Sequence, residues 1–436
     1  MARIELTQPP FSRFVGKRLL SLFLLVLACS AVLAQEISPL EPPDTARYLR
    51  WGPFRVRPGI AIDDLGYDSN VFAIPNNSPL APVGDWFLAV TPKIQGLVLF
   101  GHRAFLTFDE RLQFYAYARQ SEIDYFNNFF NTRLTVPFGR FGVYGDIGYD
   151  RTRDRPYDAQ DIRPIRKSYP VGVGFIIKIG WRTDAELGYV HGRFTAEDSN
   201  GGLICQTNPF PPPAQQCFTI AQWNNRVDTG TRLKARYLAF GRTRVLLELA
   251  QRTITFDDPA VDRNGTERRQ LVGLDFGLGG SISGTIRVGH DNFNLVDPTA
   301  TDFNGPIADI AVSYNFGSGG SRVTFVGVRD VRYTVQDSTD LYVTTGGDLR
   351  IVKYFNRFIG VEVGAGRAKL NFLGSVPARI DTDTNGSLGL LFRISENSLG
   401  RRVEYAFRYT RWIINSTLNY LDQNRGTIGF GVSYGY

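Results

Sequence analysis

The chain has 436 residues, and its 49 basic residues only slightly outnumber its 42 acidic ones. Basic and acidic residues are interspersed and form no basic stripe, which argues against a nucleic-acid-binding protein. After residue 34 the sequence never offers 18 consecutive apolar residues, so a helical membrane protein is not expected either.

The first 34 residues have the layout of a secretory signal peptide. Four basic residues precede the mostly apolar run 19–27, small residues follow it, and we expect cleavage after Ala34. Cys29 loosely fits a lipoprotein cleavage box, but a β-barrel needs no lipid anchor, so we interpret it as part of the signal peptide. The mature chain would carry 45 basic and 41 acidic residues, and Arg rather than Lys supplies most of the positive charge.

Segments from residue 54 to residue 436 alternate between apolar and polar residues with a period of two, which predicts β-strands with one apolar face. The last segment is typical, with Ile428, Phe430, Val432, Tyr434 and Tyr436 on one face and Thr427, Gly429, Gly431, Ser433 and Gly435 on the other. Residues 35–53 precede these strands and are too few for a domain, so we expect a short periplasmic lead segment there.

The spacing of these segments predicts about 18 strands, or 16 if two weak segments are misread. Their connections are of two alternating kinds. Short ones are expected at 101–102, 139–140, 180–183, 241–242 and 356–357, and long ones at 70–84, 154–166, 199–222, 257–266, 296–304 and 372–382. An even strand number with short turns at one end and long loops at the other is typical of outer-membrane barrels.

A soluble β-sandwich would also show alternation, so two further features decide between the folds. Aromatic residues cluster beside the short turns, as in the aromatic girdle of a membrane barrel: Phe100, Phe138, Phe141, Trp181, Phe240, Phe316, Tyr354, Phe355 and Phe358. The chain also stops on an aromatic residue, Tyr436, which resembles the terminal strand that barrel-assembly machinery recognises. We therefore predict an all-β protein, a single transmembrane antiparallel up-and-down β-barrel over residues 54–436, in the outer membrane.

Cys205 and Cys217 bracket a polar, proline-rich stretch inside the longest connection. An even pair of cysteines in an exported protein favours one disulfide that pins this loop. The alternatives are two free thiols or a metal site, although two cysteines with no nearby His make a poor metal set. The sequence does not decide whether the loop 199–222 folds into the barrel.

Residues 381–386, Asp-Thr-Asp-Thr-Asn-Gly, copy the first half of a calcium-binding loop, with oxygen ligands at every second position and a Gly for the bend. The twelfth position of such a loop needs a bidentate Glu, and here it is Phe392. A solvated acidic loop is therefore favoured, with calcium binding as the alternative.

A barrel of about 18 strands is wide enough to hold water, so the polar face of its strands is expected to form a channel wall. The candidate lumen-lining residues are Arg103, Arg111, Arg226, Asp228, Arg232, Lys234, Arg236, Arg244, Glu248, Arg402, Glu404 and Arg408. Charged walls select solutes through their field and through hydrogen bonds. Any single residue of the set is better explained by pairing across strands, so only the ensemble predicts a passage.

The stretch from Trp51 to Phe72 resembles the opening strand of the putative beta-barrel porin, type 2 family. The likeness rests on Gly52-Pro53-Phe54, on Pro58 and on the run 67–72, and it covers about 22 residues. A generic first strand, with Pro at its start and an Asp-Ser-Asn turn at its outer end, would show the same residues. The resemblance implies an outer-membrane barrel and, because many members are associated with surface or exopolysaccharide systems, a role in moving or anchoring polysaccharide. It implies no catalytic residue.

These features predict a passive or weakly selective pore for small hydrophilic solutes, with sugars among the candidates. The alternatives are a component of a surface or exopolysaccharide export system, a structural outer-membrane barrel and a soluble β-sandwich. No enzyme is expected, because His102, His191 and His290 fall in a short turn and on two separate strands without a visible Ser or acid partner. We expect no cofactor and no metal. The expected partners are outer-membrane lipid and lipopolysaccharide, whose phosphates suit Arg, barrel-assembly machinery and polysaccharide.

Overall fold

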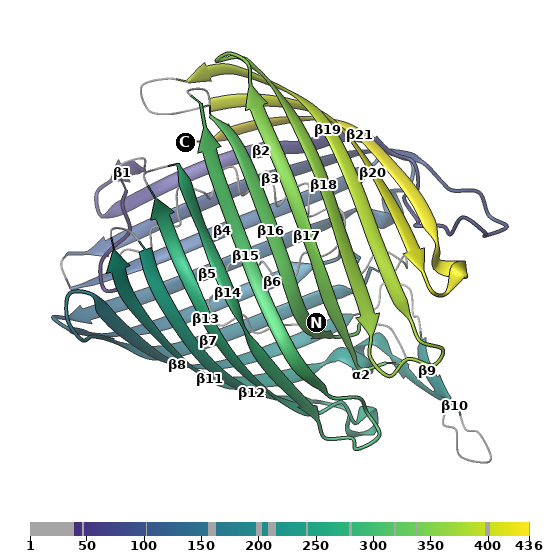
Figure 1. The fold of residues 1–436 in the computed structure, drawn as a ribbon, viewed down its shortest axis with the longest axis horizontal. Helices are drawn as coiled ribbons and strands as arrows, with labels where there is room; N and C mark the ends of the chain where they lie inside the picture. Colours follow the sequence, from purple (N-terminus) through teal and green to yellow (C-terminus); the bar gives the residue numbers. More distant parts are fainter. Residues whose placement is uncertain are drawn as a thin grey trace.

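A computed structural model describes residues 39–45, 48–101, 103–155, 163–197, 203–207, 215–240, 243–278, 281–317, 320–335, 339–396 and 402–435. Within these residues one antiparallel sheet of 19 strands curls into a closed barrel (Figure 1). The three-residue strand β1 (Leu49–Trp51) only extends the pairing of β2, so 18 strands form the wall, and the predicted count is confirmed. The expected signal peptide, with Cys29 and Ala34, lies outside the described residues.

Most wall strands have 13 to 16 residues, which is more than the ~10 needed to cross a bilayer. The wall consists of β2 (Phe54–Asp68), β3 (Asp85–Phe100), β4 (Ala104–Tyr117), β5 (Tyr125–Phe138), β6 (Phe141–Thr152), β7 (Ile165–Lys178), β8 (Thr183–Glu197), β11 (Arg226–Phe240), β12 (Thr243–Phe256), β13 (Gly265–Leu278), β14 (Ile282–Leu295), β15 (Phe303–Phe316), β16 (Ser321–Tyr333), β17 (Leu341–Tyr354), β18 (Ile359–Phe372), β19 (Ile380–Glu396), β20 (Arg402–Ser416) and β21 (Gln423–Gly435). The connections contain β9 (Leu203–Thr207), β10 (Gln215–Thr219), helix α2 (Ile220–Asn224) and the 3-10 turns η1 (Ser121–Ile123), η2 (Pro259–Val261) and η3 (Asn419–Leu421). Among the described residues, no helix is long and apolar enough to span a membrane.

The barrel closes because its first wall strand pairs with its last. β2 runs antiparallel to β21 from the pair Gly59–Gly435 to the pair Asp68–Thr427. The other wall strands pair with their neighbours in sequence, and β8 pairs with β11 across the inserted hairpin. Closure removes the two exposed edges that an open sheet would have, so the backbone groups of the wall are paired between strands.

The two ends of the barrel differ in the length of their connections. Connections such as 139–140 and 355–358 lie at one end, which we call the short-turn end. Connections such as 69–84 and 257–264 lie at the other, the long-loop end, from which the hairpin β9–β10 projects at the lower right of Figure 1. The predicted alternation of short and long connections is therefore confirmed.

The wall is apolar on its outward face and charged on its inward face. In β7, Val171, Val173 and Phe175 are exposed on the outward face, whereas Arg166 and Ser168 are buried on the inward face. Successive side chains of a strand point to opposite faces, so the sequence alternation sets this distribution. A β-sandwich would bury its apolar faces against each other, and the closed barrel with an apolar exterior excludes that alternative.

The predicted aromatic girdle at the short-turn end is present with two exceptions. Seven of its residues are exposed: Phe100, Phe138, Phe141, Trp181, Phe240, Phe355 and Phe358. Phe316 is half-buried, and Tyr354 points inward, where its hydroxyl donates to Glu404 at 2.7 Å. The prediction that Tyr354 belongs to the girdle is wrong, because the outward residues of β17 are the odd-numbered ones, such as Leu349 and Ile351.

Both interpretations of residues 381–386, the favoured solvated loop and the calcium-binding alternative, are wrong, because these residues belong to β19 and Asp381 is buried. Alternate residues of a strand are about 7 Å apart, which is too far for Asp381 and Asp383 to converge on one ion. Asp381 instead pairs with Arg379 at 2.6 Å and accepts a hydrogen bond from the hydroxyl of Ser416. The described residues contain no group of three or more potential metal ligands.

The backbone register supports the predicted disulfide in the longest connection. β9 and β10 form an antiparallel hairpin in which Cys205 lies directly opposite Cys217. Directly opposite residues have their Cβ atoms about 4.5–5.5 Å apart, and a small adjustment brings such a pair within bonding range. We expect both cysteines of the folded protein to resist maleimide labelling until a reductant is added, which mass spectrometry of the labelled protein would detect. Labelling without reductant would contradict this prediction.

Candidate functional site

Most of the predicted lumen-lining residues are on the inward face of the wall. Those residues are Arg111, Arg226, Asp228, Arg232, Lys234, Arg236, Arg244, Glu248, Glu404 and Arg408. Arg103 lies in the exposed turn between β3 and β4, beyond the wall. Arg402 is at the start of β20, and its side chain lies outside the described part of the chain.

One group of inward charges is centred on Glu186 of β8. Its carboxylate is approached by Arg133 at 3.5 Å, by Arg232 at 3.5 Å and by Arg236 at 3.1 Å. Arg133 also pairs with Asp146 at 2.6 Å, and Arg236 pairs with Asp184 at 2.5 Å. Three arginines therefore share one buried carboxylate, and the two further acids each neutralise one of them at its edge.

Tyr144 holds Arg133 of this group in place. The guanidinium lies 4.1 Å from the centre of the Tyr144 ring, a cation–π distance. A Cβ atom at Gly174 or Gly188 would come within 2.5 Å of the Tyr144 hydroxyl. The two glycines therefore leave the space in which this ring lies along the inner wall.

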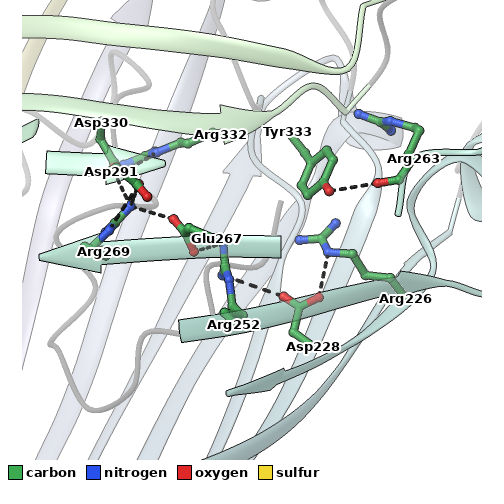
Figure 2. Close-up of polar contacts among 10 residues, drawn as sticks. All are labelled: Arg226, Asp228, Arg252, Arg263, Glu267, Arg269, Asp291, Asp330, Arg332 and Tyr333. Carbon is green, nitrogen blue, oxygen red and sulfur yellow. Dashed lines mark hydrogen bonds and ion pairs between the residues drawn. The ribbon is translucent and has the colours of Figure 1, made fainter. Parts of the chain in front are cut away.

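A second group forms a ladder of alternating charges across β11 to β16 (Figure 2). Its ion pairs run from Arg226–Asp228 at 3.2 Å through Arg252–Asp228 at 3.7 Å, Arg252–Glu267 at 2.7 Å, Arg269–Glu267 at 2.8 Å, Arg269–Asp291 at 2.7 Å and Arg269–Asp330 at 3.0 Å to Arg332–Asp330 at 3.2 Å. Four arginines meet four carboxylates, so the ladder is neutral. Every residue of the ladder contacts an opposite charge. The ladder is therefore best explained as ion pairing that joins neighbouring strands, the role that we expected for single lumen-lining residues.

A third group, on β17, β18 and β20, has two arginines for one acid. Glu362 pairs with Arg408 at 2.9 Å and also with Arg350, and all three side chains are buried. Nε and Nη1 of Arg350 have no hydrogen-bond partner among the described residues. Both atoms are buried, so an acceptor that enters the barrel would reach them only after a neighbouring side chain moved.

A polar row on β3, β4 and β5 borders open space inside the barrel. Asp109 pairs in register with Gln95 on one side and with Asn131 on the other. All three are on the inward face, and Asp109 and Asn131 are exposed. An inward residue that is exposed must face a space that water can enter, so this row marks a water-accessible part of the lumen. Gln95 donates to Asp109 at 2.7 Å.

The lead segment reaches the inner wall at the short-turn end. Leu40 is buried against Tyr144 and Ile176, two inward residues of β6 and β7. Glu41 pairs with Lys178 of β7 at 3.0 Å. The described part of this segment therefore lies against the inside of the barrel at the short-turn end.

At the long-loop end an apolar core fills part of the barrel. Helix α2 packs Ile220 and Trp223 against inward residues of the strands, including Phe256, Phe293 and Tyr333. The helix begins with a capping box, in which the Thr219 hydroxyl accepts from the backbone N–H of Gln222. The C-terminal part of the longest connection thus folds into the barrel, a point that the sequence did not decide.

Arg263, in the loop between β12 and β13, connects three loops at this end. Its guanidinium donates to the backbone oxygens of Trp223 at 2.8 Å, Thr334 at 3.0 Å and Asp340 at 2.9 Å, and it pairs with the Asp340 carboxylate at 3.0 Å. Burial lowers the pKa of Arg263 to about 10 and raises the pKa of Asp340. Arg263 therefore stays charged at neutral pH, and its burial is tolerated because both Nη atoms donate hydrogen bonds and Nε lies beside the Asp340 carboxylate.

The sequence missed several members of these groups. Six of them lie at inward positions of the alternating strands but are not among the predicted lumen-lining residues: Arg133, Asp184, Glu186, Arg269, Arg350 and Glu362. Arg263 lies in a loop, where no alternation marks it. The described histidines, His191 and His290, are exposed on the outward face of separate strands.

The family model "Putative beta-barrel porin 2" matches residues 219–434. No curated protein matches the sequence. Among solved structures, the chain is similar to a BenF-like porin from Pseudomonas fluorescens Pf-5, with 10% identity, a TM-score of 0.48, and 89% of this chain and 99% of that chain covered. It is also similar to OccAB3 from Acinetobacter baumannii, with 10% identity, a TM-score of 0.47, and 88% and 100% covered. A third is OccK2 (OpdF) from Pseudomonas aeruginosa in complex with glucuronate, with 10% identity, a TM-score of 0.46, and 87% and 96% covered.

Proposed function

We propose that this chain, whose residues 219–434 match the model of the Putative beta-barrel porin 2 family, is an outer-membrane pore for small hydrophilic solutes, with sugars among them. The observation that carries the proposal is the inward row of Gln95, Asp109 and Asn131, of which Asp109 and Asn131 are exposed. Only a space that holds water accommodates such a row on the inside of a closed barrel.

The outward face supports placement in a membrane. It presents large apolar side chains over the height of the strands, for example Phe175 and Leu187, and an aromatic girdle at the short-turn end. Exposed to water, this surface would cost about 25 cal/mol for each Å². Short turns face the periplasm in outer-membrane barrels, so we orient the short-turn end inward and the long-loop end toward the outside of the cell.

The charges of the inner wall support weak rather than strict selectivity. The ladder of Figure 2 is neutral, and the group around Glu186 has three arginines for three acids, whereas the group around Glu362 has two arginines for one acid. Arginine forks suit carboxylates, and their free N–H groups also suit hydroxyls. Small solutes rich in hydroxyl groups, neutral or acidic, fit this wall best.

A second candidate is a gated barrel of a polysaccharide export system, and the core at the long-loop end favours it. α2 and the three loops tied by Arg263 occupy part of the exit. A barrel closed in this way would conduct little until a partner or a chain of sugar displaced the loops.

The proposal is tested by single-channel recording of the purified full-length protein in a planar bilayer. We expect steady ohmic current steps that shrink when oligosaccharides are added. The absence of current steps, from protein whose gel mobility changes on heating as that of a folded barrel does, would overturn the open pore and favour the gated barrel.

Asp109→Asn tests whether the polar row lines the conducting path. Removing this negative charge should lower the preference for cations, measured as the reversal potential in a salt gradient. Glu110→Gln is the matched control, because Glu110 is the next residue of β4 and points to the outward face. An equal shift for both variants would mean that the row does not line the path.

A further inference from the structure

An open hollow of about 340 Å³ lies on the outward face, at the long-loop end of β2, β20 and β21. Tyr67, Ile428 and Tyr409 line it and belong to one row, since Ile428 pairs with both tyrosines. All three are exposed and point away from the barrel. The side of the hollow nearer the middle of the barrel is therefore an aromatic and aliphatic surface of the kind found at a membrane interface.

Arg411 lies in the next row toward the long-loop end and lines the same hollow. Its neighbours in register are Gly386 on β19 and Gly426 on β21, so no adjacent side chain covers it. A Cβ atom at Gly386 would meet no atom within 4 Å. Arg411 has no ion-pair partner in the part of the chain that the structure describes, so a cation stands in the hollow without a counter-charge.

Two further cations flank this position. Arg367 and Lys369 of β18 are exposed on the outward face, and neither has an ion pair among the described residues. Arg367 pairs with Thr384, which is two residues from Gly386 on the single strand between β18 and β20. The outward residues of that strand here are Thr382, Thr384 and Gly386, so no carboxylate neutralises the three cations.

We propose that Arg411, with Arg367 and Lys369 beside it, binds the phosphate of a phosphorylated glycolipid in the outer leaflet, a lipid of the lipid A class. The acyl chains would lie along Tyr67, Ile428 and the outward rows nearer the middle of the barrel. The phosphate would contact the cations, which lie nearer the long-loop end. The apolar row favours a lipid over free phosphate, because only a lipid fills both parts of the hollow. The proposal rests on the membrane orientation given above but not on what the barrel conducts.

The test measures binding of bisphosphorylated lipid A to the full-length protein in detergent, with dephosphorylated lipid A and inorganic phosphate as comparisons. Native mass spectrometry measures the fraction of protein with lipid bound. Gel electrophoresis of heated samples measures the temperature at which the folded band is lost, which bound lipid should raise. We expect Arg411→Gln to bind the bisphosphorylated lipid about five-fold more weakly, the effect of losing one cation near a membrane surface. Gly426→Leu keeps the cation but fills the hollow, where an added Cβ meets atoms no closer than 3.6 Å, and it should weaken binding as well.

Arg140→Gln is the matched control, because Arg140 is an exposed arginine in the short turn between β5 and β6 with no ion pair among the described residues. It should bind the lipid as the wild type does. Equal binding by all variants, or an equal loss in Arg140→Gln, would overturn the site. Binding of dephosphorylated lipid or inorganic phosphate as tight as that of the intact lipid would overturn the assigned ligand. If Arg411→Gln does not fold, Gly426→Leu decides the question alone.

Discussion

Replacing Arg263 with Met is expected to loosen the long-loop end and to destabilise the folded barrel. The substitution leaves the half-buried carboxylate of Asp340 and the backbone oxygens of Trp223 and Thr334 without this donor. Removing one partner of a buried ion pair typically costs about 3–5 kcal/mol, although part of that loss falls on the loops alone. We expect a lower temperature for loss of the folded gel band, and longer or more frequent open intervals in single-channel records.

The matched control for this change is Arg193→Met, at the same end of the barrel. Arg193 pairs with Asp257, and both side chains are about 40% exposed, so their pair should contribute about 0–1 kcal/mol. If Arg263→Met melts and conducts like Arg193→Met, the loops are held by apolar packing around Trp223 and not by the arginine. A more open channel in Arg263→Met alone would support the gated barrel as the resting state.

The architecture of the wall could be predicted because one simple rule governs it. A strand that separates lipid from a wet interior alternates over its whole length, and short and long connections alternate as the chain goes up and down. The same rule explains why Tyr354 was misplaced, since it stands beside a short turn but at an inward position. Proximity to a turn predicts an aromatic girdle only when the position also has the outward parity.

The groups inside the barrel could be predicted only in part. Alternation places Arg133 and Glu186 on the inward face, but their contact depends on the register of strands that are 53 residues apart in sequence. Arg263 contacts carbonyl groups 40 and 77 residues away, and no periodicity marks a loop residue. The run 381–386 shows the opposite error, since a local ligand pattern was weaker evidence than the pairing of β19 with both neighbours.

The interior combines two environments with different demands on a charged residue. At the long-loop end, aromatic packing buries Arg226 and Arg263 completely, so each must find its partners within the protein. Along β3 to β5 the wall is wet, and Asp109 remains exposed. Solutes would therefore meet the hydrated part of the wall, while the buried arginines hold the loops and strands together. Changes in the two regions should separate conduction from stability.

Replacing Glu186 with Gln is expected to change selectivity and stability together. The carboxylate is 3% exposed and is shared by Arg133, Arg232 and Arg236, which would face one another once it became neutral. Leaving buried charge uncompensated typically costs about 3–5 kcal/mol, so the folded gel band should disappear at a lower temperature. The added positive field should move the reversal potential in a potassium chloride gradient toward anion preference.

The matched control is Glu197→Gln, which removes the same charge from an exposed side chain on the outward face of the same strand, where Glu197 pairs with Lys167 at 2.6 Å. A shift in Glu186→Gln that Glu197→Gln does not share would place the arginine group on the conducting path. Equal shifts would show that net charge, and not the inner wall, sets the selectivity.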